Sequence, residues 1–175
     1  MGKLFYIMGK SASGKDTIYQ RLLRNPEFSL ERLVIYTTRP IRDGELDGRE
    51  YHFVTEEDFQ KLKAERKIIE DRGYETVYGL WRYFTADNMN LEEKNYLGIG
   101  TLESYEKLKA YYGEEKIRPI YIEVEDGERL KRAIAREETQ EAPKYEEMCR
   151  RFLADAQDFS EEKIRQAGIS HRFSN

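Results

Sequence analysis

Short apolar runs alternate along the chain with longer stretches in which apolar residues recur every three or four positions. This alternation predicts an α/β fold, in which a central parallel sheet is flanked by helices. Strands are expected at residues 4–8, 33–36, 96–99 and 117–124. Helices are expected at residues 15–24, 55–65, 102–112, 126–136 and 145–158.

The region between residues 37 and 92 has a less regular pattern. Residues 37–50 are rich in charge and glycine, which predicts a loop, and residues 51–54 are expected to be extended. Two further extended pieces, residues 67–71 and 74–78, are expected to turn at Gly73.

Composition narrows the classes of function. The chain has 175 residues, enough for one domain with a core of its own, and its formal net charge of −4 does not favour a nucleic-acid partner. No apolar stretch approaches the length of a membrane span. A single cysteine, Cys149, excludes an intrachain disulfide and favours a reducing compartment, so we expect a cytoplasmic protein without a membrane partner. The oligomeric state stays open.

Residues 9–15 read Gly-Lys-Ser-Ala-Ser-Gly-Lys, which fits the phosphate-binding pattern G-x-x-x-x-G-K between a strand and a helix. The glycines allow backbone N–H groups to point at phosphate oxygens, and the following helix directs its positive end at the same anion. We therefore expect ATP to be held by Gly9, Ser11, Ala12, Ser13, Gly14 and Lys15, with Asp16 and Thr17 beside them.

One position departs from this pattern. The residue after the lysine is usually Ser or Thr, whose hydroxyl binds Mg²⁺, but here it is Asp16, followed by Thr17. A carboxylate is a suitable ligand for a hard cation, so either residue is a candidate for Mg²⁺. The alternative is that Asp16 merely suits the first turn of a helix.

Residues 37–54 carry a second candidate site. Arg39 and Arg42 lie in a loop constrained by Pro40 and Gly44, and Tyr51 follows. Two guanidinium groups and a tyrosine hydroxyl suit a phosphate monoester. From these residues alone, a solvated charged loop is the alternative.

The same stretch resembles the acceptor segment of guanylate kinases, T-T-R-x-x-R-x-G-E-x-x-G-x-x-Y-x-F, at every specified position. Ile69-Glu70 followed by Tyr78-Gly79 is similar to the family's I-E and Y-G pairs. Residues 132–136, with Arg151 later, resemble its arginine-bearing lid.

This resemblance implies a P-loop kinase that transfers the γ-phosphoryl group of ATP to a nucleoside monophosphate, with GMP as the expected acceptor and Mg²⁺ as the metal. It implies one domain over residues 1–175, with a core at 1–36, 93–131 and the remainder, an acceptor-binding lobe at about 37–92, and a helical lid at about 132–150. The implied acceptor-binding residues are Arg39, Arg42, Tyr51, Glu70 and Tyr78; Arg132 would bind the donor, and Lys15, Arg42, Arg136 and Arg151 would be catalytic.

Several positions depart from the family. Gly98 and Gly100 stand where an Asp-x-Asp is expected, Ile35 or Tyr36 where a hydroxyl is expected, and Leu80 where Ser or Thr is frequent. Asp16 is a candidate replacement for the missing metal-binding acids. The sequence ends at Asn175, where a further helix is expected.

Two alternative functions follow from these departures. Ribose 1,5-bisphosphate phosphokinases are similar proteins that also tend to carry Gly-Lys-Asp in the loop and lack the Asp-x-Asp, but they do not keep the full acceptor motif. Non-catalytic guanylate-kinase-like domains bind phosphopeptides, but they usually lose the lysine that is Lys15 here.

Overall fold

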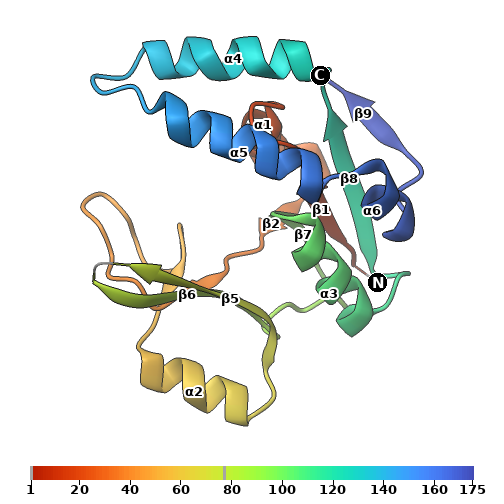
Figure 1. Ribbon diagram of the computed structural model, residues 1–175. Coiled ribbons are helices and arrows are strands. Elements are labelled where there is room, and N and C mark those ends of the chain that lie inside the picture. The colour runs from red at the N-terminus through yellow and green to blue at the C-terminus, as the bar shows by residue number, and fades with distance from the viewer. Residues whose placement is uncertain (1, 77) are drawn as a thin grey trace.

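The main sheet is parallel and has five strands in the order β2-β7-β1-β8-β9 (Figure 1). The computed structural model describes residues 2–76 and 78–175. The strands are β1 (Leu4–Met8), β2 (Leu30–Arg32), β7 (Asn95–Ile99), β8 (Ile117–Glu123) and β9 (Arg172–Ser174).

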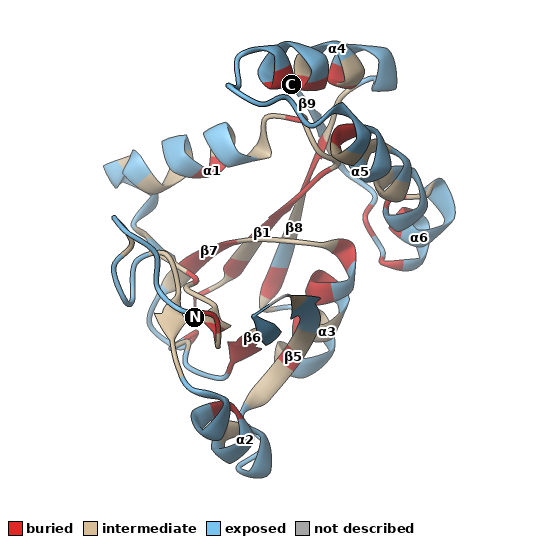
Figure 2. Ribbon diagram, turned by 60° about the vertical axis from the view of Figure 1, so that its left-hand side comes forward, coloured by how far each residue is buried: buried red, intermediate tan, exposed pale blue. Residues whose placement is uncertain are grey.

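Alternation along β1 explains why helices cover both faces of this sheet. Tyr6 and its neighbours two residues away pack on one face with α3 (Leu102–Tyr112), while Ile7 packs on the other face with Tyr19 of α1 (Lys15–Arg24). Buried residues follow β1 and β8 through the middle of the molecule (Figure 2). The predicted α/β fold with a central parallel sheet is confirmed.

Two of the remaining helices begin at side chains that bond to free backbone N–H groups. Thr55 and Asp58 form a reciprocal capping box at α2 (Glu56–Ala64), and Ser160 caps α6 (Glu161–Gln166), a helix not expected from the sequence. The others are α4 (Asp126–Glu138), α5 (Tyr145–Asp158) and a 3₁₀ turn at Pro26–Phe28. Within residues 2–76 and 78–175, no helix is both long and apolar enough to cross a bilayer.

A separate mixed sheet has the strand order β4-β3-β6-β5. Its long antiparallel hairpin is the main difference from the expected elements. The expected turn at Gly73 is wrong, because Gly73 pairs with Arg82 inside a continuous strand; residue 77 of the expected segment 74–78 lies outside the described residues. The strands are β3 (Tyr36–Thr37), β4 (His52–Phe53), β5 (Ile68–Thr76) and β6 (Gly79–Ala86).

The strand expected at residues 33–36 is also misplaced. Pairing with β7 occupies Leu30–Arg32, and the N–H of Leu33 makes the last bond, to the carbonyl of Leu97, before the chain leaves the main sheet. Leu33 and Ile35 are apolar because they pack into the core as the chain passes between the two sheets.

Candidate active site

The candidate site lies at the carboxyl edge of the main sheet. β1 and β7 are parallel neighbours, with Ile7 opposite Ile99, so the loop after β1 and Gly100 after β7 emerge at the same edge. In open α/β sheets this edge is where ligands bind.

Residues 9–14 form a tight loop between β1 and α1. Ala12 and Gly14 adopt left-handed backbone angles, with φ of 61° and 82°. A Cβ on Gly9 would lie 2.7 Å from the carbonyl oxygen of Ile122, so the loop packs closely against β8. Ser13 is fully buried, and no described residue bonds to its hydroxyl. An orphaned polar atom inside a loop of this shape fits a phosphate cradle.

A buried arginine that the sequence pattern did not single out holds this loop from behind. Arg129 of α4 is 1% exposed; its Nε donates to the carbonyl of Ser11 at 3.0 Å, and its guanidinium also contacts Asp126 and Asp155. Asp155 of α5 in turn accepts the N–H of Ser11 at 2.7 Å. Helices α4 and α5 therefore fix the position of the loop.

Lys15, Asp16 and Thr17 begin α1. Asp16 has an exposed side chain, and its carboxylate lies 3.8 Å from Lys15 Nζ. No cluster of three metal-ligating side chains occurs in the described part of the chain. A Mg²⁺ ion at Asp16 would therefore take most of its ligands from phosphate and water, as this ion commonly does at nucleotide sites.

Arg39 forms a rigid pair with Glu45 in the loop before β4. Arg39 is 4% exposed, and its two terminal nitrogens donate to the two carboxylate oxygens of Glu45 at 2.8 and 2.6 Å. The N–H of Arg42 donates to the same carboxylate at 2.9 Å, while the Arg42 side chain is exposed. The hydrogen bonds from Arg39 are the main reason why the pKa of Glu45 is lowered to about 2.

Tyr83, rather than Tyr78, completes the aromatic surroundings of Arg39. The rings of Tyr51 and Tyr83 are 5.6 Å apart, and Arg39 lies over the Tyr51 ring at 5.1 Å. Glu45 first and then Tyr83 raise the pKa of Arg39 by hydrogen bonding. Tyr78 is at the tip of the hairpin, 82% exposed, where it stacks on Trp81. The structure therefore does not bring Tyr78 to the other predicted phosphate-binding residues.

Glu70 lies at the inner end of the hairpin. It is 4% exposed; the hydroxyl of Thr85 donates to its Oε1 at 2.7 Å, and Arg72 Nε lies 3.3 Å from its Oε2. Thr85 of β6 therefore anchors Glu70 from the neighbouring strand.

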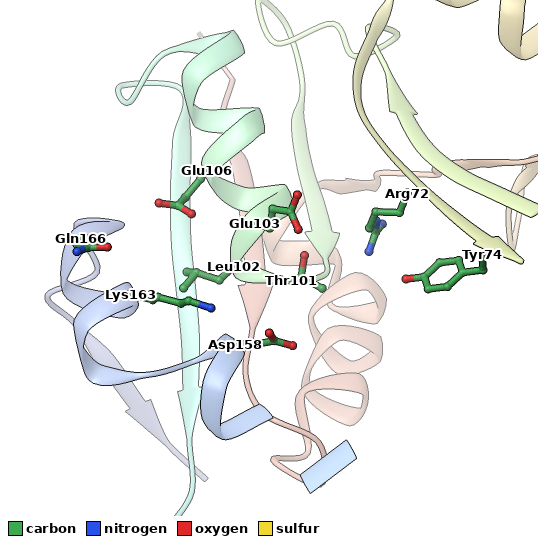
Figure 3. Close-up of a pocket in the computed structure, with 9 residues that line it drawn as sticks. All are labelled: Arg72, Tyr74, Thr101, Leu102, Glu103, Glu106, Asp158, Lys163 and Gln166. Atoms are coloured by element: carbon green, nitrogen blue, oxygen red, sulfur yellow. The ribbon is translucent and has the colours of Figure 1, made fainter. Parts of the chain in front are cut away.

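Two cavities adjoin this end of the hairpin, and Arg72 and Tyr74 line both. One has a volume of about 540 Å³ and lies between the hairpin and residues near the ends of α3, α5 and α6 (Figure 3). The other, of about 400 Å³, joins the small sheet to the carboxyl edge of β7. Its walls are Ile35, Tyr51, Arg72, Tyr74, Trp81, Tyr83, Ile99 and Gly100.

Tyr6 fills the space beside Gly98 of β7 and Gly100, the residue that follows this strand. A Cβ on Gly98 would lie 2.6 Å from the Tyr6 ring, and a Cβ on Gly100 would lie 2.1 Å from its hydroxyl. Tyr6 is 3% exposed, and burial raises its pKa to about 12. The volume that carboxylates would need is therefore filled by a neutral phenol.

The three arginines expected in a lid lie on α4 and α5. Arg132 donates to Glu128 at 3.0 Å, and Arg151 donates to Glu147 at 2.7 Å. Arg136 is exposed and has no ion pair within residues 2–76 and 78–175. In this structure Arg132 and Arg151 are held by acids of their own helices.

Comparisons with known proteins agree with these features. The family model described as Guanylate kinase matches residues 1–163. A guanylate kinase of Wolbachia pipientis wMel is 31% identical over 157 residues, covering 89% of this chain and 75% of that protein. One of Schizosaccharomyces pombe is 39% identical over 101 residues, covering 58% of this chain and 44% of that protein.

The fold comparison points the same way. The crystal structure of guanylate kinase from Anaplasma phagocytophilum matches with a TM-score of 0.64 at 20% identity, covering 99% of this chain and 77% of that one. The fold and the loop after β1 define a P-loop α/β protein. The chain belongs to the guanylate kinase family, as a divergent member. It spans less than half the length of the Schizosaccharomyces pombe relative.

Proposed function

We propose that this protein transfers the γ-phosphoryl group of ATP to a nucleoside monophosphate, with GMP as the reference acceptor that the family suggests. The observation that carries the proposal is the buried Arg39, held rigidly by Glu45 among tyrosines that line the cavity reaching the carboxyl edge of β7. A fixed guanidinium beside Tyr51 and Tyr83 suits a phosphate monoester.

Phosphoryl transfer of this kind depends on positioning and charge neutralisation rather than on a covalent intermediate. The loop at 9–15 and Lys15 would hold the donor phosphates, with Arg132 nearby. Asp16 and Thr17 would hold Mg²⁺, which neutralises phosphate charge when bound. Arg42, Arg136 and Arg151 would complete the site when the proposed lid, at about 132–150, closes on the proposed acceptor lobe, at about 37–92.

The proposed partners are small nucleotides, and the proposed compartment is the cytoplasm. Nothing in the charge balance favours nucleic acid as a partner, because acidic residues outnumber basic ones by 34 to 30.

A coupled steady-state assay with Mg²⁺-ATP and a panel of GMP, AMP, UMP and ribose 1,5-bisphosphate tests the proposal. Lys15→Ala should lower kcat/KM by at least about tenfold, because it removes a charge-assisted contact of about 1.5–3 kcal/mol. Lys61→Ala, at an exposed position of α2, is the matched control and should leave turnover unchanged. Equal turnover in wild type and Lys15→Ala would refute the assignment of the donor loop.

A further inference from the structure

The cavity of about 400 Å³ is the proposed acceptor cavity, and at the end where the base would lie, Arg72 stands beside Glu70, the carboxylate that guanine recognition needs. Resting on the proposed function, we infer that Arg72 is a specificity determinant. It pairs with Glu70 and so weakens the selection of guanine by that acid, which allows a base without the N1–H and amine donor pair, such as uracil, to compete.

The alternation of the hairpin places these groups on one face. Directly opposed residues of antiparallel strands point to the same side, and Arg72 is opposite Tyr83, while Glu70 is opposite Thr85. Arg82 lies on the other face, where it covers Phe59 of α2 and donates to Glu56. The cavity-facing side of the hairpin is therefore set by strand register.

Glu70 has little capacity left for a guanine base. Guanine recognition by one carboxylate requires acceptance from the ring N1–H and the exocyclic amine together. In this structure Thr85 bonds to one oxygen, Arg72 lies 3.3 Å from the other, and the Glu70 side chain is 2% exposed. Guanine would have to displace the Arg72 guanidinium, with a cost in Coulomb energy, before it reached the acid.

Arg72 itself has unused donors. Its Nε is buried beside Glu70 without a hydrogen bond, and no described residue accepts a hydrogen bond from its guanidinium. The Arg72 side chain is 25% exposed, so its terminal nitrogens are the donors that a ligand can reach. Figure 3 shows Arg72 and Tyr74 on the hairpin side of the larger cavity, across from Thr101 and Glu103.

The surroundings of the guanidinium favour a flat ring. Tyr74, Trp81 and Tyr83 line the smaller cavity together with Arg72, and Tyr74 and Tyr83 are 5.7 Å apart. Aromatic walls provide apolar area for a base, and a guanidinium donates well to carbonyl oxygens in its plane. The missing acids at Gly98 and Gly100 leave no other carboxylate on β7 to receive guanine donors.

Trp81 provides a direct measurement, because it is the single tryptophan of the chain and it lines the cavity. Titrations of its fluorescence with GMP and UMP, without ATP, report binding independently of turnover. Wild type should bind UMP at least as tightly as GMP, because Glu70 is not free to favour guanine. Arg72→Ala should shift this ratio at least tenfold toward GMP, a change of about 1.4 kcal/mol.

Arg82→Ala is the matched control, since it removes a guanidinium from the opposite face of the same hairpin and should leave the ratio unchanged. Arg72→Gln repeats the test with a side chain of similar shape, should Arg72→Ala fail to fold by circular dichroism. An unchanged ratio in both Arg72 variants, weaker GMP binding in either of them, or preferential GMP binding by wild type would overturn the inference.

Two further outcomes separate this inference from the proposed function. Selective UMP binding without turnover would support the specificity role and refute the proposed kinase. Binding of ribose 1,5-bisphosphate but of neither nucleotide would overturn the inference, since Arg72 would then be reading a phosphate.

Discussion

Arg39 and Arg72 each lie beside a glutamate, but the two pairs differ in geometry. At the proposed phosphate end of the site, Arg39 and Glu45 form two short hydrogen bonds, and the backbone of Arg42 adds a third. At the proposed base end, Arg72 and Glu70 are 3.3 Å apart without a hydrogen bond.

This difference separates a pair that is fully bonded from a pair in which the arginine keeps donors for a ligand. A bidentate arginine–carboxylate pair fixes both groups and defines the direction in which the remaining guanidinium donors point. A single loose approach leaves Arg72 with donors that a ligand can accept from while its charge stays beside Glu70. The phosphate end should therefore bind every acceptor alike, whereas the base end should discriminate among acceptors.

The largest expected effect is at the phosphate end. Arg39→Ala should raise the acceptor KM roughly 10- to 100-fold, and by the same factor for every acceptor that is turned over, because the phosphate is common to all. The KM for ATP should change little. Arg49→Ala, an exposed arginine of the same loop paired with Glu50, is the control. A factor that depended on the base would contradict the division into two ends.

The next prediction tests whether the Tyr6 side chain fills the space beside Gly100. Gly100→Asp should lower the free energy of unfolding by about 1–3 kcal/mol, because its Cβ would overlap the Tyr6 hydroxyl. Tyr6→Leu in the same chain should recover part of that loss, a coupling measurable by denaturant unfolding of the four variants. If the changes in unfolding free energy of the two single variants simply add in the double variant, Tyr6 moves aside without cost.

An effect of similar size tests the hydroxyl that anchors Glu70. Thr85→Val keeps the shape but removes the donor to Oε1, which should cost about 1–3 kcal/mol of unfolding free energy. Thr85→Ser keeps the hydroxyl and should cost less. The loss in Thr85→Val should increase when Arg72 is also alanine, because the buried carboxylate then has neither partner; equal losses in both backgrounds would contradict this arrangement.

The smallest expected effect is on acid stability. The pKa of Glu45 falls from 4.5 to about 2 on folding, chiefly because of its hydrogen bonds from Arg39. The unfolded chain binds this proton first, so the pair contributes stability above pH 4.5 that is lost as the pH falls toward 2. Unfolding free energy should therefore fall less steeply over this range in Glu45→Gln than in wild type. Parallel curves would exclude the pair as a contributor.

Local sequence pattern was sufficient for much of the fold. Helices α1, α3 and α5 begin and end at the predicted residues, because apolar spacing and terminating residues agree within each segment. The hairpin differs from the prediction because Gly73, a typical turn residue, has cross-strand partners on either side that keep it within β5. Tyr78 and Gly79 therefore lie at the tip of the hairpin.

The acceptor motif predicted that Arg39 and Tyr51 would lie together, and they do; their roles toward substrate stay predictions. Arg72 and Arg129 were beyond reach of local pattern. Arg129 bonds to Asp155 and Ser11, which are 26 and 118 positions away from it in the sequence. Such partners come together only when the strands and helices are assembled. The spacing of residues along a helix does not distinguish a buried arginine from a solvated one.

The contact between Tyr6 and the two glycines of β7 also constrains the order in which substitutions can accumulate. An acid at Gly100 is obstructed while Tyr6 is present, and a smaller residue at position 6 leaves a void while the glycines remain. Each single step toward an acidic strand end passes through a less stable protein. A lineage that acquired this tyrosine would therefore tend to retain it, and the altered base end would persist through drift even without selection on the substrate.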